Sequence, residues 1–155
     1  MSGVKSFLLA IDLAGRKRDD AIQGLMQAQR SHLFAQDQLA QLETYAAETE
    51  SKWTATAQSG TTPEMLRHQY QFMDRLQQAI GLQNGVLGNE THKVDAAKRI
   101  VLAAEFRLHG LNQVLKKKRA DIAAIQSRRE QKQMDEFAAM RSRQVSTGHL
   151  TGERS

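Results

Sequence analysis

Two long tracks of mostly apolar residues, with alternating three- and four-residue spacing, run through this 155-residue chain. Ten of thirteen positions in the first track and fourteen of eighteen in the second are apolar. Spacing of this kind over more than three heptads is typical of a coiled coil rather than of a globular helix. The first track comprises Ile11, Ala14, Arg18, Ala21, Leu25, Ala28, His32, Ala35, Leu39, Leu42, Ala46, Thr49 and Trp53. The second comprises Leu66, Gln69, Met73, Leu76, Ile80, Gln83, Leu87, Glu90, Val94, Ala97, Val101, Ala104, Leu108, Leu111, Leu115, Lys118, Ile122 and Ile125.

A short polar segment, Ser-Gly-Thr-Thr-Pro at 59–63, separates the two tracks. Thr61 or Thr62 can cap a following helix, and Pro63 suits its first turn, where a missing N–H costs nothing. Thr61 with Glu64 also matches a capping box. The segment therefore predicts the end of one helix and the start of another.

The chain is accordingly predicted to be all-α, with two long helices in an antiparallel coiled-coil hairpin. Folding at the turn makes positions that sum to about 121 face each other, so the end of the second helix is left with little or no partner. The predicted single hairpin domain covers 1–144, with helices at about 7–58 and 63–140, a turn at 59–62 and a disordered tail at 145–155.

Small residues occur both in the seam and elsewhere in the helices. Alanine fills much of the first track, which favours close approach of the two backbones. Gly81, Gly85 and Gly88 fall inside the second helix, where each weakens helix propensity by about 1 kcal/mol. We interpret these glycines as a further place of close approach, with a hinge or a short break as the alternative.

Nothing in the sequence indicates catalysis. There is no cysteine, no phosphate-binding loop and no paired arrangement among the five histidines. No catalytic residue, cofactor or metal site is therefore predicted, and the chain is not expected to be an enzyme. It has no apolar run of about 20 residues that could cross a membrane, so a cytoplasmic location is expected.

The positive charge lies at one end of the chain. Residues 116–155 hold ten Lys/Arg and five Asp/Glu, whereas residues 1–115 hold twelve of each. Such a patch attracts an acidic protein, a phosphate backbone or an anionic membrane, unless it is simply a solvated helix face. Ile122 and Ile125 continue the apolar track within it, where the first helix has run out. We interpret this stretch as a partner site; alternatively, residues before Phe7 cover it or the chain self-associates there.

Apolar residues near the turn suggest a second partner site. Phe72 is outside the seam, and a two-helix hairpin cannot cover both faces of a helix. Some of Phe72, Leu76, Val86 and Phe106 must therefore stay exposed. A cluster of exposed apolar residues near the hairpin tip indicates a surface for a partner.

Three stretches resemble the FliJ family of flagellar type III export proteins. They are residues 68–80 (His-Gln-Tyr-Gln-Phe-Met-Asp-Arg-Leu-Gln-Gln-Ala-Ile), residues 129–138 (Arg-Glu-Gln-Lys-Gln-Met-Asp-Glu-Phe-Ala) and residues 38–45. Heptad spacing alone is weak evidence, because every coiled coil has it. The second stretch is the most specific of the three, because it matches the family in residue types as well. The resemblance spans nearly the whole chain but departs at the basic, Ser-Thr-Gly-containing tail.

The resemblance implies a soluble, non-enzymatic component of the export apparatus, peripherally associated with the inner membrane, whose hairpin is similar to the central stalk of rotary ATPases. It implies that the open end enters the hexameric export ATPase, that Phe72 and Leu76 contact the membrane export gate, and that export chaperones are escorted. The residues predicted to bind partners are Phe72, Leu76, Lys116, Lys117, Arg119, Ile122, Ile125, Arg128, Arg129, Lys132, Asp135, Glu136 and Phe137.

Two other functions stay open at this point. One is a stalk protein of the related injectisome, which the sequence does not separate from the flagellar system. The other is a basic helical protein that binds nucleic acid through residues 116–143. Acidic residues interleave this segment at Asp121, Glu130, Asp135 and Glu136, so no nucleic acid is expected as a partner.

Overall fold

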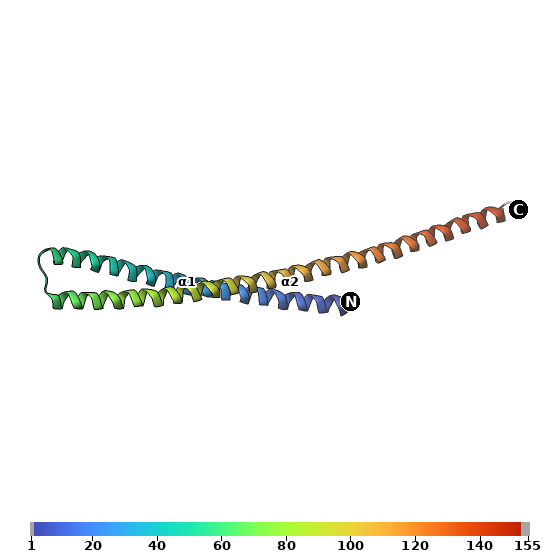
Figure 1. Cartoon of the computed structure of the whole chain (residues 1–155). Helices are drawn as coiled ribbons and strands as arrows, with labels where there is room; N and C mark the ends of the chain where they lie inside the picture. Colours follow the sequence, from blue (N-terminus) through green and yellow to red (C-terminus); the bar gives the residue numbers. More distant parts are fainter. Residues whose placement is uncertain (1, 153–155) are drawn as a thin grey trace. The chain divides into compact units, whose positions relative to one another are not determined.

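A computed structural model describes residues 2–152, which form two α-helices and no strand (Figure 1). Helix α1 spans Ser2–Gln58 and helix α2 spans Pro63–Gly152. The prediction of an all-α chain with one turn between two long helices is therefore confirmed.

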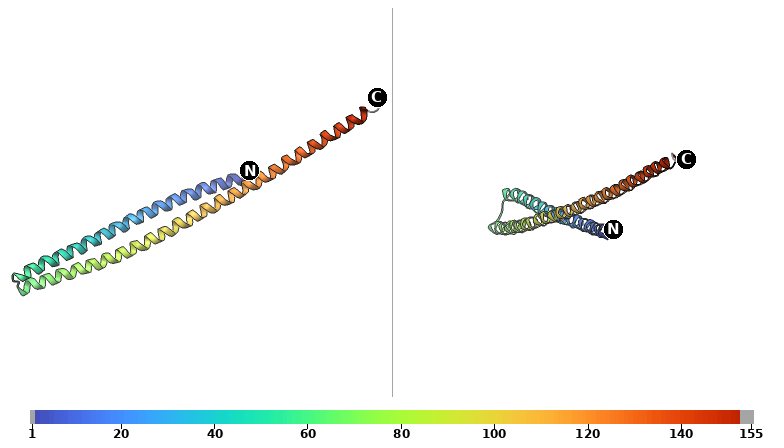
Figure 2. Two further views of the ribbon diagram at one scale, coloured as in Figure 1. Left: turned by 90° about the horizontal axis from the view of Figure 1, so that it is seen from above. Right: turned by 90° about the vertical axis from the view of Figure 1, so that its right-hand side faces the viewer.

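The described residues divide into two compact units. The first, residues 13–108, is called the hairpin unit here, and the second, residues 2–12 with residues 109–152, is called the terminal unit. In the hairpin unit, α1 and α2 run side by side in opposite directions on either side of the turn (Figures 1 and 2). The antiparallel hairpin is thus confirmed for this unit. The single domain over residues 1–144 stays a prediction.

The core of the hairpin unit is the predicted seam. Every track position from Ala14 to Leu108 is buried or half-buried. The most buried side chains are small or medium-sized, which lets the two helices approach closely and leaves a thin core. They are Ala14, Ala35, Leu39, Ala46, Leu76 and Val101.

The turn is fixed by a glycine and a threonine. Gly60 has a φ of 109°, a left-handed conformation that favours glycine, and its N–H donates to the carbonyl of Ala57 at 3.2 Å. Thr62 caps α2, because its Oγ1 accepts a hydrogen bond from the N–H of Met65 at 3.2 Å. The predicted capping box of Thr61 with Glu64 is wrong, because Thr62 holds the capping position and Met65 therefore stands where the box needs Glu64.

Two polar contacts across the seam report its register. The side-chain amide of Gln83 donates to the carbonyl of Ala35 at 3.0 Å, and Nε2 of His32 lies 3.1 Å from Oγ1 of Thr91. The hydroxyl of Thr91 donates to the carbonyl of Leu87 at 2.9 Å, so its oxygen accepts from the His32 ring. The facing positions sum to 118 and 123, which confirms the predicted register of about 121.

The interpretation of the three glycines in α2 is wrong. Gly81, Gly85 and Gly88 are exposed, and a Cβ added to any of them meets no described atom beyond its own stretch of helix within 4 Å. They lie on the outer face of α2 because the neighbouring seam positions, Ile80 and Leu87, face α1. The helix continues through them without a break.

Both helices are longer than predicted. Helix α1 begins at Ser2 instead of near Phe7, and α2 continues to Gly152 instead of ending near Met140. No proline follows Pro63, so nothing in the chain forces α2 to stop. Of the predicted disordered tail at 145–155, residues 145–152 are helical and residues 153–155 lie outside the described part.

Candidate partner-binding surfaces

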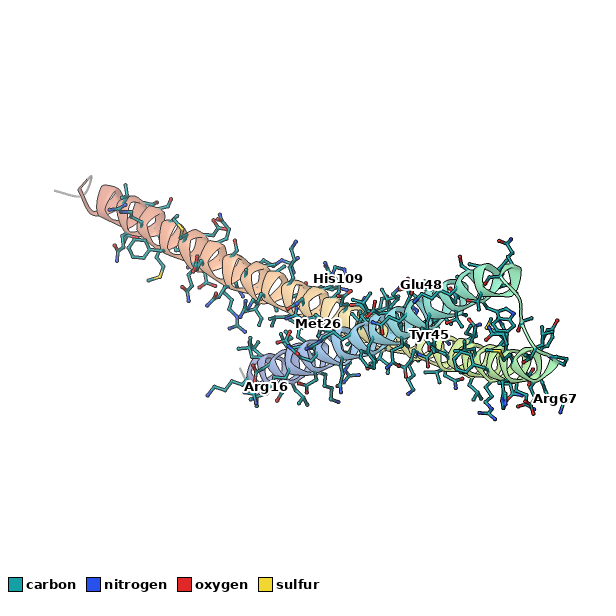
Figure 3. The ribbon with its side chains drawn as sticks, turned by 90° about the vertical axis from the view of Figure 1, so that its left-hand side faces the viewer. Arg16, Met26, Tyr45, Glu48, Arg67 and His109 are labelled. Carbon is teal, nitrogen blue, oxygen red and sulfur yellow. The ribbon has the colours of Figure 1, made fainter. Side chains whose placement is uncertain are left out.

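Near the turn, an aromatic pair joins the two helices of the hairpin unit. The rings of Tyr45 on α1 and Phe72 on α2 meet edge to face, with centroids 6.2 Å apart and planes at 80°. They remain 51% and 37% exposed, respectively. Tyr45 is labelled in Figure 3, where the side chains of the hairpin are drawn as sticks. The pair therefore both braces the helices and offers aromatic surface to a partner.

The two residues expected to contact the export gate differ in their surroundings. Phe72 is partly exposed, as its off-seam position predicts, whereas Leu76 is only 8% exposed. Leu76 is therefore a core residue of the hairpin unit. A partner can contact Phe72 directly, but it can reach little of the Leu76 side chain.

A shallow groove, called the tip groove here, adjoins Phe72. Half-buried Trp53 of α1 lines it opposite residues from the first turns of α2. Gln69 also lines the groove, and its Nε2 is buried and has no hydrogen-bond partner among residues 2–152. Such an unpaired donor destabilises the fold. The residues lining the groove are Trp53, Met65, His68, Gln69, Gln71, Phe72 and Arg75.

The second predicted surface is the part of α2 from residue 116 to residue 147, called the arm here. Every residue of the arm is exposed. Within the terminal unit, the beginning of α1 lies beside the start of the arm, beyond which the rest of the arm continues as a single helix (Figure 2, left). The arm therefore offers most of its circumference to partners.

The beginning of α1 covers only the first turns of the arm. Nζ of Lys118 lies 4.3 Å from the centroid of the Phe7 ring, a cation–π contact. Gly3 and Val4 line a small groove together with Asp121 and Ile122. Residues before Phe7 thus extend α1 and cover part of the apolar track, which was one of the alternatives.

The apolar track continues on the arm with incomplete cover. Ile122 is 37% exposed and Ile125 is 50% exposed. Lys116, Lys117 and Arg119 precede them and are also exposed, and no acidic group of the described residues lies within ion-pairing distance of these three. Apolar surface and unpaired positive charge therefore occur together, a combination that suits an acidic partner surface.

Further along the arm, side chains gather in a way that the sequence reasoning missed. Met134, Phe137, Ala138 and Val145, called the distal stripe here, line one face of α2 together with Glu130 and Arg141. Met134, Phe137 and Val145 are 68%, 67% and 69% exposed. The intervals of four, three and four residues from Glu130 to Arg141 could have indicated this face. They were missed because the first and last of these residues are charged instead of apolar.

The distal stripe and the apolar track lie on different sides of α2. At 100° per residue, the centre of the distal stripe is turned by roughly 140° from Ile122 and Ile125. The heptad phase therefore changes between Ile125 and Met134. One flat partner surface cannot cover both sets of residues.

The described part of the chain contains no cluster of histidine, cysteine or acidic side chains that could hold a metal ion. None of its helices has a stretch long and apolar enough to cross a membrane.

Two comparisons relate the chain to known proteins. The model of a family described as flagellar FliJ protein matches residues 5–146. A flagellar FliJ protein from Salmonella typhi is 30% identical over 127 residues, which cover 82% of this chain and 86% of that protein. The family match includes the tip groove, the basic residues of the arm and the distal stripe.

Proposed function

Because the chain belongs to the FliJ family of flagellar proteins, we propose that it is a non-enzymatic component of the flagellar type III protein export apparatus. In this proposal the arm engages the hexameric export ATPase, and the Tyr45–Phe72 pair engages the membrane export gate. The chain works in the cytoplasm, associates peripherally with the inner-membrane apparatus and escorts export chaperones.

One observation supports the ATPase assignment above others. The apolar track runs onto the arm at Ile122 and Ile125, which are 37% and 50% exposed beside lysines that have no ion pair among the described residues. Burial of two such isoleucines by a partner contributes about 1–2 kcal/mol each. Positive charge next to them guides an acidic surface into contact and lowers the number of unproductive encounters.

The assignment is tested by binding of the purified export ATPase to the full chain. The variant carries Ile122→Ser and Ile125→Ser. The matched control carries Leu82→Ser and Leu102→Ser, at two exposed leucines elsewhere in α2. We expect the first pair to weaken binding by at least about tenfold and the control to leave it unchanged. Equal binding by both variants would place the ATPase contact outside the apolar track.

The gate assignment rests on the exposed aromatic pair and on the tip groove beside it. In this proposal an apolar side chain of the gate protein packs against Phe72 and Trp53 in the groove, which His68 and Arg75 also line. Phe72→Ala removes this contact and should weaken binding of the gate protein. Phe106→Ala is the control, because Phe106 is 81% exposed and is not among the residues that line the tip groove.

The two alternatives are less well supported. The matched family model and the matched relative are both described as flagellar, which favours the flagellar system over the injectisome. A nucleic-acid role needs an uninterrupted basic surface, whereas Glu130, Asp135 and Glu136 are exposed between the basic residues of the arm. Binding of duplex DNA and of the export ATPase can be compared at 150 mM salt. Weak binding of DNA together with tight binding of the ATPase would support the export role over a nucleic-acid role.

A further inference from the structure

The distal stripe is the part of the arm that the assignment to the ATPase does not use. It lies on the side of α2 away from the apolar track, and its large side chains are about two-thirds exposed. Three exposed apolar side chains on one face of a helix favour contact with a second surface. The order of residues along this face indicates what that surface is.

The spacing of the residues on this face is the same in both directions along the helix. Along it, Glu130, Met134, Phe137 and Arg141 follow one another at intervals of four, three and four residues. If a second copy of the helix is laid against it in the opposite direction, residues that sum to 271 face each other. Met134 then meets Phe137 of the second copy, and Glu130 meets Arg141 of the second copy. Each of these contacts occurs twice because the pair is related by a two-fold axis.

The parallel arrangement lacks this match. It places Glu130 opposite Glu130 and Arg141 opposite Arg141, so like charges meet at both ends of the apolar contact. Like charges facing each other destabilise a helix pair, and opposite charges help to set the orientation. The charges on this face therefore select the antiparallel arrangement over the parallel one.

The beginning of α1 leaves room for the second helix. In the terminal unit, Gly3 and Val4 lie beside Lys118, Asp121 and Ile122, on the side of the apolar track. The distal stripe faces roughly 140° away from that side at 100° per residue. A second arm can therefore lie along residues 126–145 without meeting α1 of the same terminal unit.

We propose that the distal stripe is a self-association surface, on which the arms of two copies of this chain pack antiparallel about a two-fold axis between residues 135 and 136. Two apolar layers of Met134 with Phe137 form its centre, and two pairs of Glu130 with Arg141 close its ends. Four large side chains make a small interface, so the dimer is weak and depends on concentration.

The first test is sedimentation equilibrium of the full chain, without any flagellar partner, across a range of concentrations. We expect a reversible monomer–dimer equilibrium. Arg141→Glu places carboxylates opposite each other at both ends and should weaken the dimer by about tenfold. Glu130→Arg combined with Arg141→Glu restores opposite charges and should return the dissociation constant to within about threefold of the original. A double variant no better than the single one contradicts the proposed pairing.

The second test uses the absence of cysteine from the chain. A Met134→Cys variant mixed with a Phe137→Cys variant should form a disulfide between the two chains under mild oxidation. Met134→Cys alone should form far less, because two copies of position 134 do not face each other in the antiparallel pair. Preferential cross-linking of position 134 to itself would show a parallel pair and overturn the proposal.

A third measurement separates self-association from binding to lipid. Vesicles of phosphatidylglycerol and phosphatidylcholine are mixed with the full chain and with a Met134→Ser, Phe137→Ser variant. We expect these substitutions to abolish the dimer and to leave vesicle binding unchanged. A chain that stays monomeric at all concentrations, and binds vesicles only with the stripe intact, contradicts the proposal. Since none of these experiments includes the export ATPase, their failure is distinct from failure of the assigned export role.

Discussion

The ring of Phe72 meets the ring of Tyr45 edge to face, with the centroids 6.2 Å apart, across the two helices of the hairpin unit. Neither residue belongs to the seam. This ring contact gives Phe72 a modest structural role. Since 37% of its surface remains exposed, the side chain is also accessible for the proposed contact with the gate. Substitution of this residue should therefore affect binding more than stability.

Phe72→Ala should lower the free energy of unfolding by about 1 kcal/mol, the value of an aromatic pair of this kind. Leu76→Ala should lower it by about 2–3 kcal/mol, because Leu76 is a buried seam residue. Urea denaturation followed by circular dichroism measures both values. Binding of the gate protein should fall for Phe72→Ala while the helix content stays unchanged. An equal loss of stability for the two variants would make Phe72 a core residue and remove the reason for assigning it to a partner.

Replacement of Gly81, Gly85 and Gly88 by alanine should stabilise the chain. Each alanine improves helix propensity by about 1 kcal/mol, and the added methyl groups meet no described atom beyond their own stretch of helix within 4 Å. The triple variant should therefore unfold at higher temperature, as measured by circular dichroism. Gly60→Ala is the matched control, and it should destabilise because Gly60 has a φ of 109°. A triple variant less stable than the original would indicate that the glycines are needed for packing.

Gln69→Leu should raise the free energy of unfolding by about 1 kcal/mol. The substitution removes a buried amide nitrogen that lacks a partner among the described residues and puts an apolar side chain into the seam. Gln83→Leu is a useful comparison, because the amide of Gln83 donates to the carbonyl of Ala35 and that bond is lost. Chemical denaturation should give the larger gain for Gln69→Leu. The reverse order would indicate that a water molecule or a partner satisfies Gln69.

The sequence predicted the seam well because heptad spacing reports directly which face of each helix is buried. The register and the buried alanines followed from this spacing together with the position of the turn, which was recognised from its own residue types. The spacing also placed Tyr45 near Phe72, since their numbers sum to 117, but the pair was missed because neither residue is in the seam. The interpretation of Gly81, Gly85 and Gly88 as a place of close approach was wrong. It relied on the small size of glycine, which does not indicate which face of the helix a residue occupies.

The ends of the helices and the distal stripe were harder to predict. Nothing in the sequence before Phe7 has a strong start signal, and the contact of Phe7 with Lys118 depends on the packing of segments far apart in the chain. The polar residues after Met140 resemble a disordered tail in composition, yet they contain no proline that would end α2. Met134 and Val145 were missed because the apolar face changes sides along the arm.

In the proposed function, the basic and apolar start of the arm engages the export ATPase. The most direct test is the ATP hydrolysis rate of the purified ATPase at physiological salt, with the full chain or with a variant carrying Lys116→Glu, Lys117→Glu and Arg119→Glu. A control with Lys98→Glu, Arg99→Glu and Arg107→Glu changes the net charge equally at exposed residues of the hairpin unit. We predict that the original chain and the control stimulate hydrolysis equally, while the arm variant stays helical and loses stimulation by at least about tenfold. Full stimulation by the arm variant would contradict engagement of the ATPase by this part of α2.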